Sequence, residues 1–380
     1  MSKKLPTVWT ATEHTKAKIA ILKGYLDAWF RILGKTRKNQ PILYVDGFAG
    51  PGIYANHNEG SPLAAVAAAA GAINQLNGAF IAQGLHCAFI EKDQERYEKL
   101  KECLAPHQGN ALLGISHYRC EFVDGIEAVR KALPGPFNGD GPLFVFADPF
   151  GGTGIPFKTF AACMAGAASE LLINLDADGI GRIFKADNNN REEQLTALFG
   201  DESWRDVLSL ADPLPQTSLK ILNLYKQRIR TLPGVKYVWS FAMRGSNDAI
   251  NYHLVFASKH PLGLEKMKEA MKKLDQTGTY SFSDAHVDQH ALFKGDNEAH
   301  YADGLWRVFE GKTVSYDEVH TYALNETPFL NAKSMLKNLE GREMVIPVLY
   351  QGAIRKKGDF PDEKVQSLRF GTFAEPTLFN

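Results

Sequence analysis

The chain has 380 residues, of which 44% are hydrophobic and 11% aromatic, and such a chain is expected to form one domain of about 250 residues plus a smaller one. Lysine plus arginine and aspartate plus glutamate each total 43, so net charge gives no sign of a nucleic-acid partner, although a local basic patch would be enough for one. The four cysteines are scattered without a C-x-x-C pair, and we find no signal peptide and no apolar run of membrane-spanning length, which together predict a cytoplasmic protein with reduced thiols.

The first predicted element is an amphipathic helix over residues 19–34. Its apolar residues recur at alternating spacings of three and four, and a glycine ends it. An aromatic and polar segment precedes this helix, and N-terminal segments are often no more than packed cover. We therefore interpret the segment as cover rather than as a lid over a pocket. The residues concerned are Trp9, His14, Thr15 and Lys16.

A buried strand and a glycine-rich turn come next. The short apolar run at residues 42–45 ends in Asp46, and Gly50 and Gly52 then allow the backbone to bend tightly and to approach a ligand closely. A carboxylate beside this turn repels phosphate, so a cationic or hydroxyl-bearing ligand fits better than a nucleotide phosphate. An ordinary strand-turn is the alternative, because two glycines at this spacing are a weak signal alone.

Three further apolar runs are each followed at once by an acid, and helical patterns separate them. Strands that alternate with helices in this way predict a parallel sheet with right-handed crossovers. Ligands of such sheets bind at the carboxyl ends of the strands, and four clustered carboxylates are hard to explain by stability alone, because they repel one another. The sequence therefore predicts an acidic binding edge. The runs are residues 87–90 before Glu91, 120–123 before Asp124 and 143–147 before Asp148.

The tetrad at residues 148–151 is the best candidate for chemistry. Asp148 and the backbone carbonyl of Pro149 could accept hydrogen bonds from an exocyclic amine, and Phe150 could stack on the ring that carries the amine. Methyl transfer to nitrogen is an in-line displacement, so an enzyme contributes mostly by positioning the reactants. The alternative interpretation is a rigid strand-to-loop turn with a buried phenylalanine.

The sheet is expected to end in an antiparallel hairpin. A fifth strand is predicted at residues 171–175, and runs at 237–243 and 252–258 flank a turn. Farther on, alternate residues could face one side of a strand and bind a metal. They lie in a polar linker, however, and we predict no metal site. They are Asp284, His286, Asp288 and His290.

The C-terminal part is predicted to be a winged helix. A helix ends at Phe309, a capping box that begins at Ser315 opens a second helix, and Thr327-Pro328 opens a third. Strands at 344–349 and 365–370 form the wing. A third helix with a basic wing suits nucleic acid, although winged helices also dock proteins. The candidate phosphate contacts are Arg355, Lys356 and Lys357.

The order of these motifs resembles that of a Class I S-adenosylmethionine-dependent methyltransferase over about residues 40–260. The tetrad resembles the D-P-P-Y-type motif of enzymes that methylate exocyclic amines of nucleobases, and more closely the D-P-F-G form of tRNA guanine-N2 dimethyltransferases. Over nearly the whole chain the sequence resembles the bacterial three-Cys-motif partner family. The matching features are the segment from Trp9 to Trp29, VDGFAGPG, GSPL, DPFG, FGDESW and HLVFASKHPLGLEKMK.

This resemblance implies S-adenosyl-L-methionine as the cofactor, whose sulfonium, ammonium and ribose hydroxyls suit an acidic edge. Glu91 is expected to hold the ribose hydroxyls and Asp124 to lie near the adenine amine. The family name further implies a partner protein with a three-cysteine motif. The full expected cofactor set is Asp46, Phe48, Ala49, Gly50, Gly52, Glu91, Lys92, Asp124 and Gly125.

The sequence therefore predicts a Rossmann-like methyltransferase domain over residues 1–275, a linker at 276–303 and a winged helix at 304–380. The expected activity is methyl transfer to an exocyclic amino nitrogen of a base in DNA or RNA, with no membrane partner. One alternative is a non-catalytic subunit that keeps the cofactor fold and recruits the three-cysteine partner. A weaker alternative is a dinucleotide-dependent oxidoreductase, because the third glycine of G-x-G-x-x-G is absent.

Overall fold

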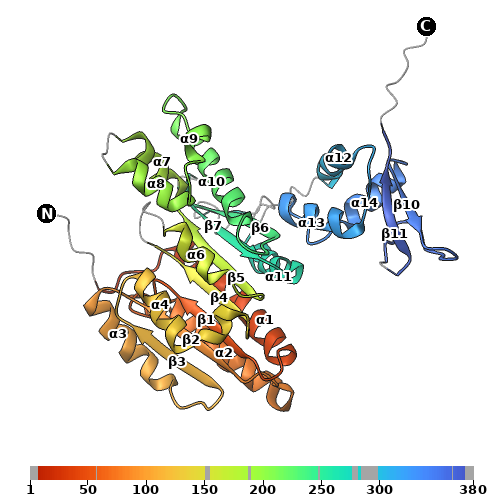
Figure 1. The fold of residues 1–380 in the computed structure, drawn as a ribbon. Coiled ribbons are helices and arrows are strands. Elements are labelled where there is room, and N and C mark those ends of the chain that lie inside the picture. Colours follow the sequence, from red (N-terminus) through yellow and green to blue (C-terminus); the bar gives the residue numbers. More distant parts are fainter. Residues whose placement is uncertain are drawn as a thin grey trace, which may run out of the picture. The chain divides into compact units, whose positions relative to one another are not determined.

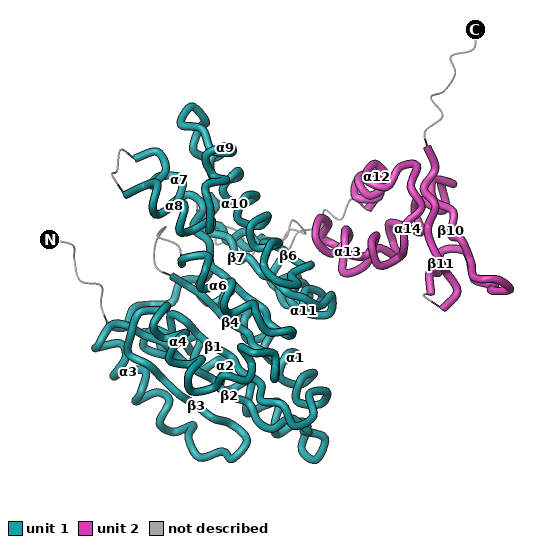
Figure 2. Tube along the Cα trace, viewed as in Figure 1, with its two compact units in different colours: residues 1–276, 280–291 teal, residues 277–279, 292–380 magenta. Residues whose placement is uncertain are grey.

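The computed structural model describes residues 7–56, 58–149, 155–186, 190–246, 249–275, 281–283, 298–361 and 363–372. The chain divides into two compact units, which Figure 2 distinguishes by colour and which are described separately below. Unit 1 comprises residues 1–276 and 280–291, and unit 2 comprises residues 277–279 and 292–380. Among the helices within these described ranges, none is both long and apolar enough to cross a membrane.

Unit 1 is built on one eight-stranded sheet in the order β3-β2-β1-β4-β5-β7-β6-β8 (Figure 1). Strands β1 to β5 are parallel, and β7 runs antiparallel to both β5 and β6. The predicted α/β fold, a mostly parallel Rossmann-like methyltransferase sheet with a terminal antiparallel hairpin, is confirmed. The strands are β1 Pro41–Asp46, β2 Gly84–Ile90, β3 Leu113–Tyr118, β4 Leu143–Ala147, β5 Ser169–Leu175, β6 Tyr237–Arg244, β7 Ile250–Ser258 and β8 Ser281–Ser283.

Helices cover both faces of this sheet, because alternate strand residues are apolar on each side. On one face, Tyr25 and Trp29 of α1 pack on Phe144 of β4, and α1 also contacts α2 and α11. On the other face, Val145 belongs to a core built with α4, α6, α7, α8 and α10. The helices are α1 Glu13–Thr36, α2 Ser61–Leu76, α3 Gln94–Leu104, α4 Phe122–Ala132, α5 Pro134–Asn138, α6 Phe157–Cys163, α7 Ala177–Lys185, α8 Arg191–Phe199, α9 Trp204–Val207, α10 Leu214–Arg230 and α11 Pro261–Lys272, with 3-10 turns η1 Asn77–Ala79 and η2 Ala105–His107.

The order of the strands reverses between β1 and β4, which are hydrogen-bonded neighbours at the centre of the sheet. Chain connections leave this point in opposite directions, and open α/β sheets bind their ligands outside the carboxyl ends of such strands. The loops that follow β1 and β4 are therefore where the fold places a site.

The predicted strand at residues 120–123 is wrong. The third strand is β3, and Phe122 begins α4 instead, because Phe122, Ile126 and Val129 recur at helical spacing and are all buried. Gly125 lies inside this helix, where an added Cβ would come within 2.6 Å of the Ile90 side chain. Asp124 is consequently an exposed residue in the first turn of α4.

The predicted end of the first helix is also wrong, since α1 continues through Gly34 to Thr36. An added Cβ at this glycine would lie 2.8 Å from the ring of Phe80. The glycine therefore provides room for an aromatic ring and does not end the helix.

The described residues of unit 2 form three helices and a three-stranded sheet in the order β10-β11-β9, and the winged helix stays a prediction. Ser315 forms the predicted capping box with Glu318. The third helix begins at Lys333 and not at Thr327, whose hydroxyl donates back to the carbonyl of Ala323 at the end of the preceding helix. The elements are α12 Glu298–Phe309, β9 Thr313–Val314, α13 Tyr316–Glu326, α14 Lys333–Gly341, β10 Val345–Leu349 and β11 Val365–Phe370.

The segment with Asp284, His286, Asp288 and His290 lies outside the described residues. Within the described part of the chain, no group of three or more histidine, cysteine, aspartate or glutamate side chains is arranged to hold a metal ion.

Candidate functional site

The carboxylate of Asp46, the last residue of β1, is completely buried. Its Oδ1 accepts the Phe48 N–H at 3.2 Å, whereas its Oδ2 has no hydrogen-bond partner. Burial raises the pKa of Asp46 to about 7, and the nearby charges of Asp148 and Glu91 add to the rise, while hydrogen bonds from Ser61 and Phe48 oppose it. A buried acceptor without a donor is uncommon in folded proteins, so this oxygen points to a ligand.

The turn after β1 needs its glycines for their conformation. Gly50 and Gly52 have φ values of +63° and +81°, in the left-handed region that disfavours side chains. Glu91, just after β2, accepts the Gly50 N–H at 2.9 Å through Oε2 and the Asp93 N–H at 2.8 Å through Oε1. Asp46 and Glu91 thus fix the backbone of this turn through hydrogen bonds to their carboxylates. Each carboxylate oxygen of Glu91 has a further lone pair that these bonds do not use.

Phe48 and Ala49 complete the turn. The Phe48 ring stacks on Phe122, with centroids 5.3 Å apart and an interplanar angle of 12°, and the Ala49 N–H donates to the carbonyl of Ile90 at 2.9 Å. These contacts fix the turn against the ends of β2 and α4.

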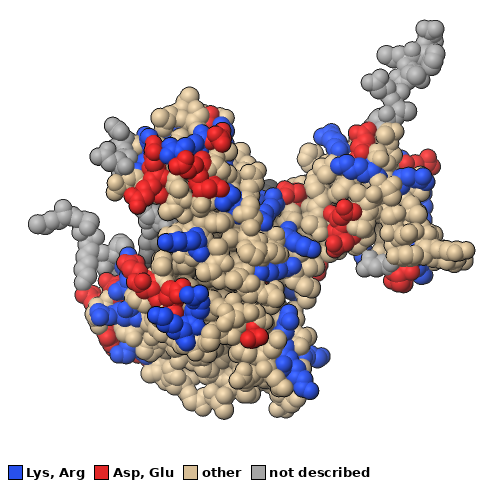
Figure 3. Space-filling model, viewed as in Figure 1, with Lys and Arg blue, Asp and Glu red and all other residues tan. Residues whose placement is uncertain are grey.

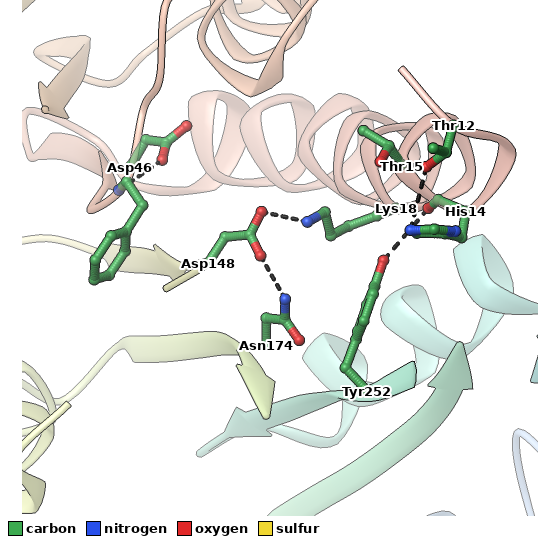
Figure 4. A network of polar contacts seen from close by, with 9 residues as sticks. Thr12, His14, Thr15, Lys18, Asp46, Asp148, Asn174 and Tyr252 are labelled. Carbon is green, nitrogen blue, oxygen red and sulfur yellow. Dashed lines mark hydrogen bonds and ion pairs between the residues drawn. The ribbon is translucent and has the colours of Figure 1, made fainter. Parts of the chain in front are cut away.

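The carboxylate of Asp148, which follows β4, is held by two side chains from distant parts of unit 1 (Figure 4). Its Oδ2 forms an ion pair with Lys18 of α1, and its Oδ1 accepts the Asn174 amide N–H at 2.6 Å. This bond orients the Asn174 amide, whose Oδ1 is buried and has no hydrogen-bond partner. The Lys18 ammonium also lies 5.3 Å from the ring centroid of Tyr252.

Two cavities meet at Asp148. One is lined by the glycine-rich turn, residues 48–54, together with Ile19, Ser61 and Phe146. The other is lined by residues of the N-terminal segment and by Pro149, Asn174, Asp176, Asn251 and Tyr252. Asp148, Lys18 and Trp9 line both cavities. The ion pair therefore lines both a small cavity of about 30 Å³ at the glycine turn, room for about one water molecule, and a second cavity of about 330 Å³.

The N-terminal segment begins α1, as expected, and three of its residues also lie at the second cavity. Trp9, His14 and Thr15 line the second cavity, and the Tyr252 hydroxyl donates to the His14 carbonyl at 3.5 Å. Lys16, in contrast, pairs with Glu13 at the surface.

The other residues of the predicted cofactor set, Asp46 and Glu91 included, line neither of these cavities. Lys92 forms an ion pair with Glu121 at 3.3 Å, with both side chains 65% exposed. Glu121 is the acid that follows β3 and precedes α4, a position that sequence reasoning assigned to Asp124. Asp124 lines neither cavity. Phe150 lies outside the described residues.

The three predicted phosphate contacts of unit 2 do not form one set. The Arg355 guanidinium pairs with Glu340, and these side chains are only 9% and 10% exposed. Arg355 also donates to the carbonyls of Lys356 and Asp359, at 3.0 and 2.9 Å. The side chains of Lys356 and Lys357 are exposed. Arg355 is therefore committed to internal bonds, and only the two lysines are free to face a partner.

No protein-family model matches this chain, and no curated protein matches it. Among solved structures, the chain is similar to Trm1 from Pyrococcus horikoshii in complex with S-adenosyl-L-methionine, with 11% identity and a TM-score of 0.36 over 70% of this chain and 61% of that chain. It is also similar to an O-methyltransferase from Bacillus cereus in complex with SAH, with 12% identity and a TM-score of 0.33 over 62% of this chain and 80% of that one. The O-methyltransferase TomG from Streptomyces achromogenes gives 13% identity and a TM-score of 0.31 over 66% and 92%.

Proposed function

We propose that this protein is an S-adenosylmethionine-dependent methyltransferase that acts on an exocyclic amino nitrogen of a nucleic acid base. One observation carries the proposal: the Asp148 carboxylate lines both a small cavity of about 30 Å³ at the glycine turn, which would have to widen to hold a cofactor, and a second cavity of about 330 Å³. A methyltransferase needs two adjoining chambers, since the methyl group must pass in line from one bound molecule to the other.

The residues around the glycine turn fit the cofactor. The buried, unbonded Oδ2 of Asp46 offers a site for a donor or a positive charge, and Glu91 can accept ribose hydroxyls with its remaining lone pairs. The backbone at Gly50 and Gly52 allows a close approach. When bound there, S-adenosylmethionine would supply an electrophilic methyl group.

On the substrate side, the chain supplies acceptors for an amine. The Asp148 carboxylate and the Pro149 carbonyl would take the N–H groups of the amine and orient its lone pair, and Asn174 Oδ1 offers another acceptor beside them. Lys18 forms an ion pair with Asp148 in this structure. A substrate amine therefore has to share the Asp148 carboxylate with Lys18 or displace Lys18 from it. Asp148 is also placed to take the proton that the nitrogen loses once it is methylated.

A second candidate activity is methyl transfer to a hydroxyl oxygen. It is favoured by the Lys18 ammonium, which lines both chambers and could stabilise an oxygen that loses its proton during attack. The two candidates predict different products, N-methylated bases or O-methylated substrates.

Labelled methyl transfer to total tRNA, ribosomal RNA and DNA tests the proposal. We expect label in N-methylated nucleosides, identified by mass spectrometry after hydrolysis, and loss of this label in Asp148→Asn. Calorimetry should show binding of S-adenosylmethionine to both proteins, so that the loss of label reports on chemistry.

Three outcomes would argue against the proposal. Label only in O-methylated products would favour the second candidate. A protein that binds the cofactor yet labels no nucleic acid, alone or with a partner carrying a three-cysteine motif, would be a non-catalytic binding subunit. Tight binding of NADH in place of S-adenosylmethionine would contradict the cofactor assignment.

A further inference from the structure

The exposed face of α14 carries two lysines one helical turn apart. Lys333 and Lys337 are both exposed, and residues four apart lie on the same side of a helix. The opposite side of α14 is buried in the core of unit 2 through Met335, Leu336 and Leu339. The helix therefore presents a basic side to its surroundings.

The loop between β10 and β11 is folded back onto this helix. Arg355 of the loop pairs with Glu340 of α14, and the Gly358 N–H donates to Glu340 Oε2 at 2.7 Å. The loop backbone also packs on Lys337, since an added Cβ at Gly358 would lie 3.1 Å from the Lys337 Cγ. These contacts hold the exposed Lys356 and Lys357 close to the basic side of α14.

These lysines lack internal partners. Lys333, Lys337, Lys356 and Lys357 form no ion pair with any residue that the structure describes, and the one buried acid beside them, Glu340, is already paired with Arg355. Unit 1 carries a group of acidic side chains instead, which gather over α8 and α9 on the face seen in Figure 3. Arg205 is paired with Glu192 in that region.

We propose that Lys333, Lys337, Lys356 and Lys357, here called the lysine face, bind the phosphate backbone of nucleic acid. A helix with a neighbouring hairpin loop can place the helix at a groove and the loop along the adjoining backbone, and unpaired lysines supply the attraction. The inference extends the proposed function, because it names the surface that would hold the nucleic acid substrate. It also assigns Arg355 to positioning the loop, so that Arg355 makes no phosphate contact.

Apolar residues at the end of the loop agree with this partner. Ile354, two positions before Lys356, is 83% exposed, and Tyr350, which directly follows β10, is 48% exposed. Proteins that bend or grip nucleic acid often place apolar side chains against bases or sugars beside their basic contacts.

The test is the salt dependence of binding by the full chain to a labelled mixed-sequence DNA duplex and to labelled tRNA. Three variants remove the helix pair (Lys333→Ala, Lys337→Ala), the loop pair (Lys356→Ala, Lys357→Ala) or all four lysines. The control, Lys312→Ala with Arg369→Ala, removes two exposed basic residues of the same unit, and Arg369 lies between the buried Leu368 and Phe370 and therefore on the outer face of the sheet.

Each lost phosphate contact lowers the log–log salt slope by about 0.9, so we expect each pair to flatten it by about 2 and all four by about 3 to 4. The control variant should keep the wild-type slope. An unchanged slope in the four-lysine variant would overturn the inference, as would equal flattening by the control, which would indicate only general charge. Binding of an acidic peptide that the four-lysine variant loses, with nucleic acid binding unchanged, would overturn the inference and assign the face to a protein partner.

This readout is independent of methyl transfer. A flattened slope in a protein that labels no nucleic acid would support the lysine face and contradict the proposed activity. An active enzyme whose salt slope does not respond to the four substitutions would support the proposed activity and contradict the lysine face.

Discussion

Two buried carboxylates lie at opposite ends of the same sheet, and they differ in how well they are satisfied. Near the amino end of β5, Glu170 accepts the Tyr25 hydroxyl at 2.5 Å and the Ser258 hydroxyl at 2.7 Å. At the carboxyl end of β1, Asp46 has an oxygen with no partner. Burial raises the pKa of both groups, so a raised pKa alone does not separate a structural carboxylate from a functional one.

Cavity size is an equally poor guide. A cavity of about 420 Å³ lies beside the satisfied Glu170, lined also by Tyr25, Trp29, Arg37 and Lys259. Glu170 there ties α1 to β5 and β7, which is a structural role. The lesson is that neither burial nor cavity volume separates the two carboxylates, whereas the unpaired oxygen of Asp46, directly before the glycine-rich turn, does.

The largest expected effect is on the stability of the protein, through the hydrogen-bonded carboxylate of Glu170. Glu170→Ala leaves the buried Tyr25 hydroxyl without an acceptor, at about 1–3 kcal/mol, and removes one hydrogen bond of about 1 kcal/mol from the Ser258 hydroxyl, which still has the His260 carbonyl at 3.0 Å. We therefore expect the free energy of unfolding to fall by about 2–4 kcal/mol. Urea denaturation measures this fall. The folded variant should bind S-adenosylmethionine as the wild type does. A specific loss of cofactor binding would contradict the structural role of Glu170.

The next effect is on turnover at the other end. Asp148→Asn removes a positioned charge from the reaction site, so kcat should fall by about 10²-fold or more while cofactor affinity changes little. Asn251→Ala provides a control, because Asn251 lines the same cavity but is exposed and makes no contact with Asp148 in this structure. Single-turnover kinetics would decide, and unchanged turnover in Asp148→Asn would remove this residue from the chemistry.

A smaller effect is expected on cofactor affinity. Glu91→Ala removes a buried carboxylate that braces the glycine turn, and a hydrogen bond to such a charged group contributes about 1.5–3 kcal/mol, which corresponds to roughly tenfold or more in Kd. Asp124→Ala should leave Kd unchanged, since Asp124 is exposed on α4. Calorimetry on both variants tests the two expectations, and equal losses would restore Asp124 to the site.

The effect that is smallest at neutral pH is a pH dependence of the affinity. The pKa of Asp46 is raised from 3.8 to about 7, so the folded protein holds this proton between about pH 4 and pH 7 while the unfolded chain has lost it. Stability contributed by Asp46 therefore falls as pH rises through this window, and it levels off above about 7.

A cationic ligand has the opposite preference, because it favours ionised Asp46. The affinity for S-adenosylmethionine should therefore rise with pH by up to about tenfold per unit below 7 and then level off. Asp46→Asn should bind more weakly and with a flat profile. Titration calorimetry from pH 5.5 to 8.5 checks both curves, and a wild-type profile that is itself flat would exclude Asp46 as the titrating group.

Sequence patterns predicted the elements with strong local signals. The strands before Asp46, Glu91 and Asp148 were found because each is a short apolar run bounded by an acid. The third strand was missed because β3 is a half-exposed strand with polar residues, whereas the apolar run after it belongs to α4. The helical spacing of the apolar residues from Phe122 to Val129 was the signal that could have identified this run as a helix.

The partners of Asp148 had no local signal. Lys18 lies 130 positions from it and Asn174 lies 26 positions from it, so only the folded sheet brings them together. Arg355 was grouped with its neighbours Lys356 and Lys357 because the three look alike in sequence. Glu340 at the end of an amphipathic helix, directly after the buried Leu339, was the sign that a buried cation would be needed there.

The dependence of the site on α1 has a consequence for how the protein is made. His14 and Tyr252, which lie together at the second cavity, are 238 positions apart in the chain. A ribosome therefore releases the first helix long before the strand that completes the chamber has been synthesised. During translation the chain has a glycine turn and an acidic edge well before the second cavity can form. A chain that stops before β7 would therefore keep parts of the proposed cofactor site yet lack Tyr252 at the proposed substrate cavity.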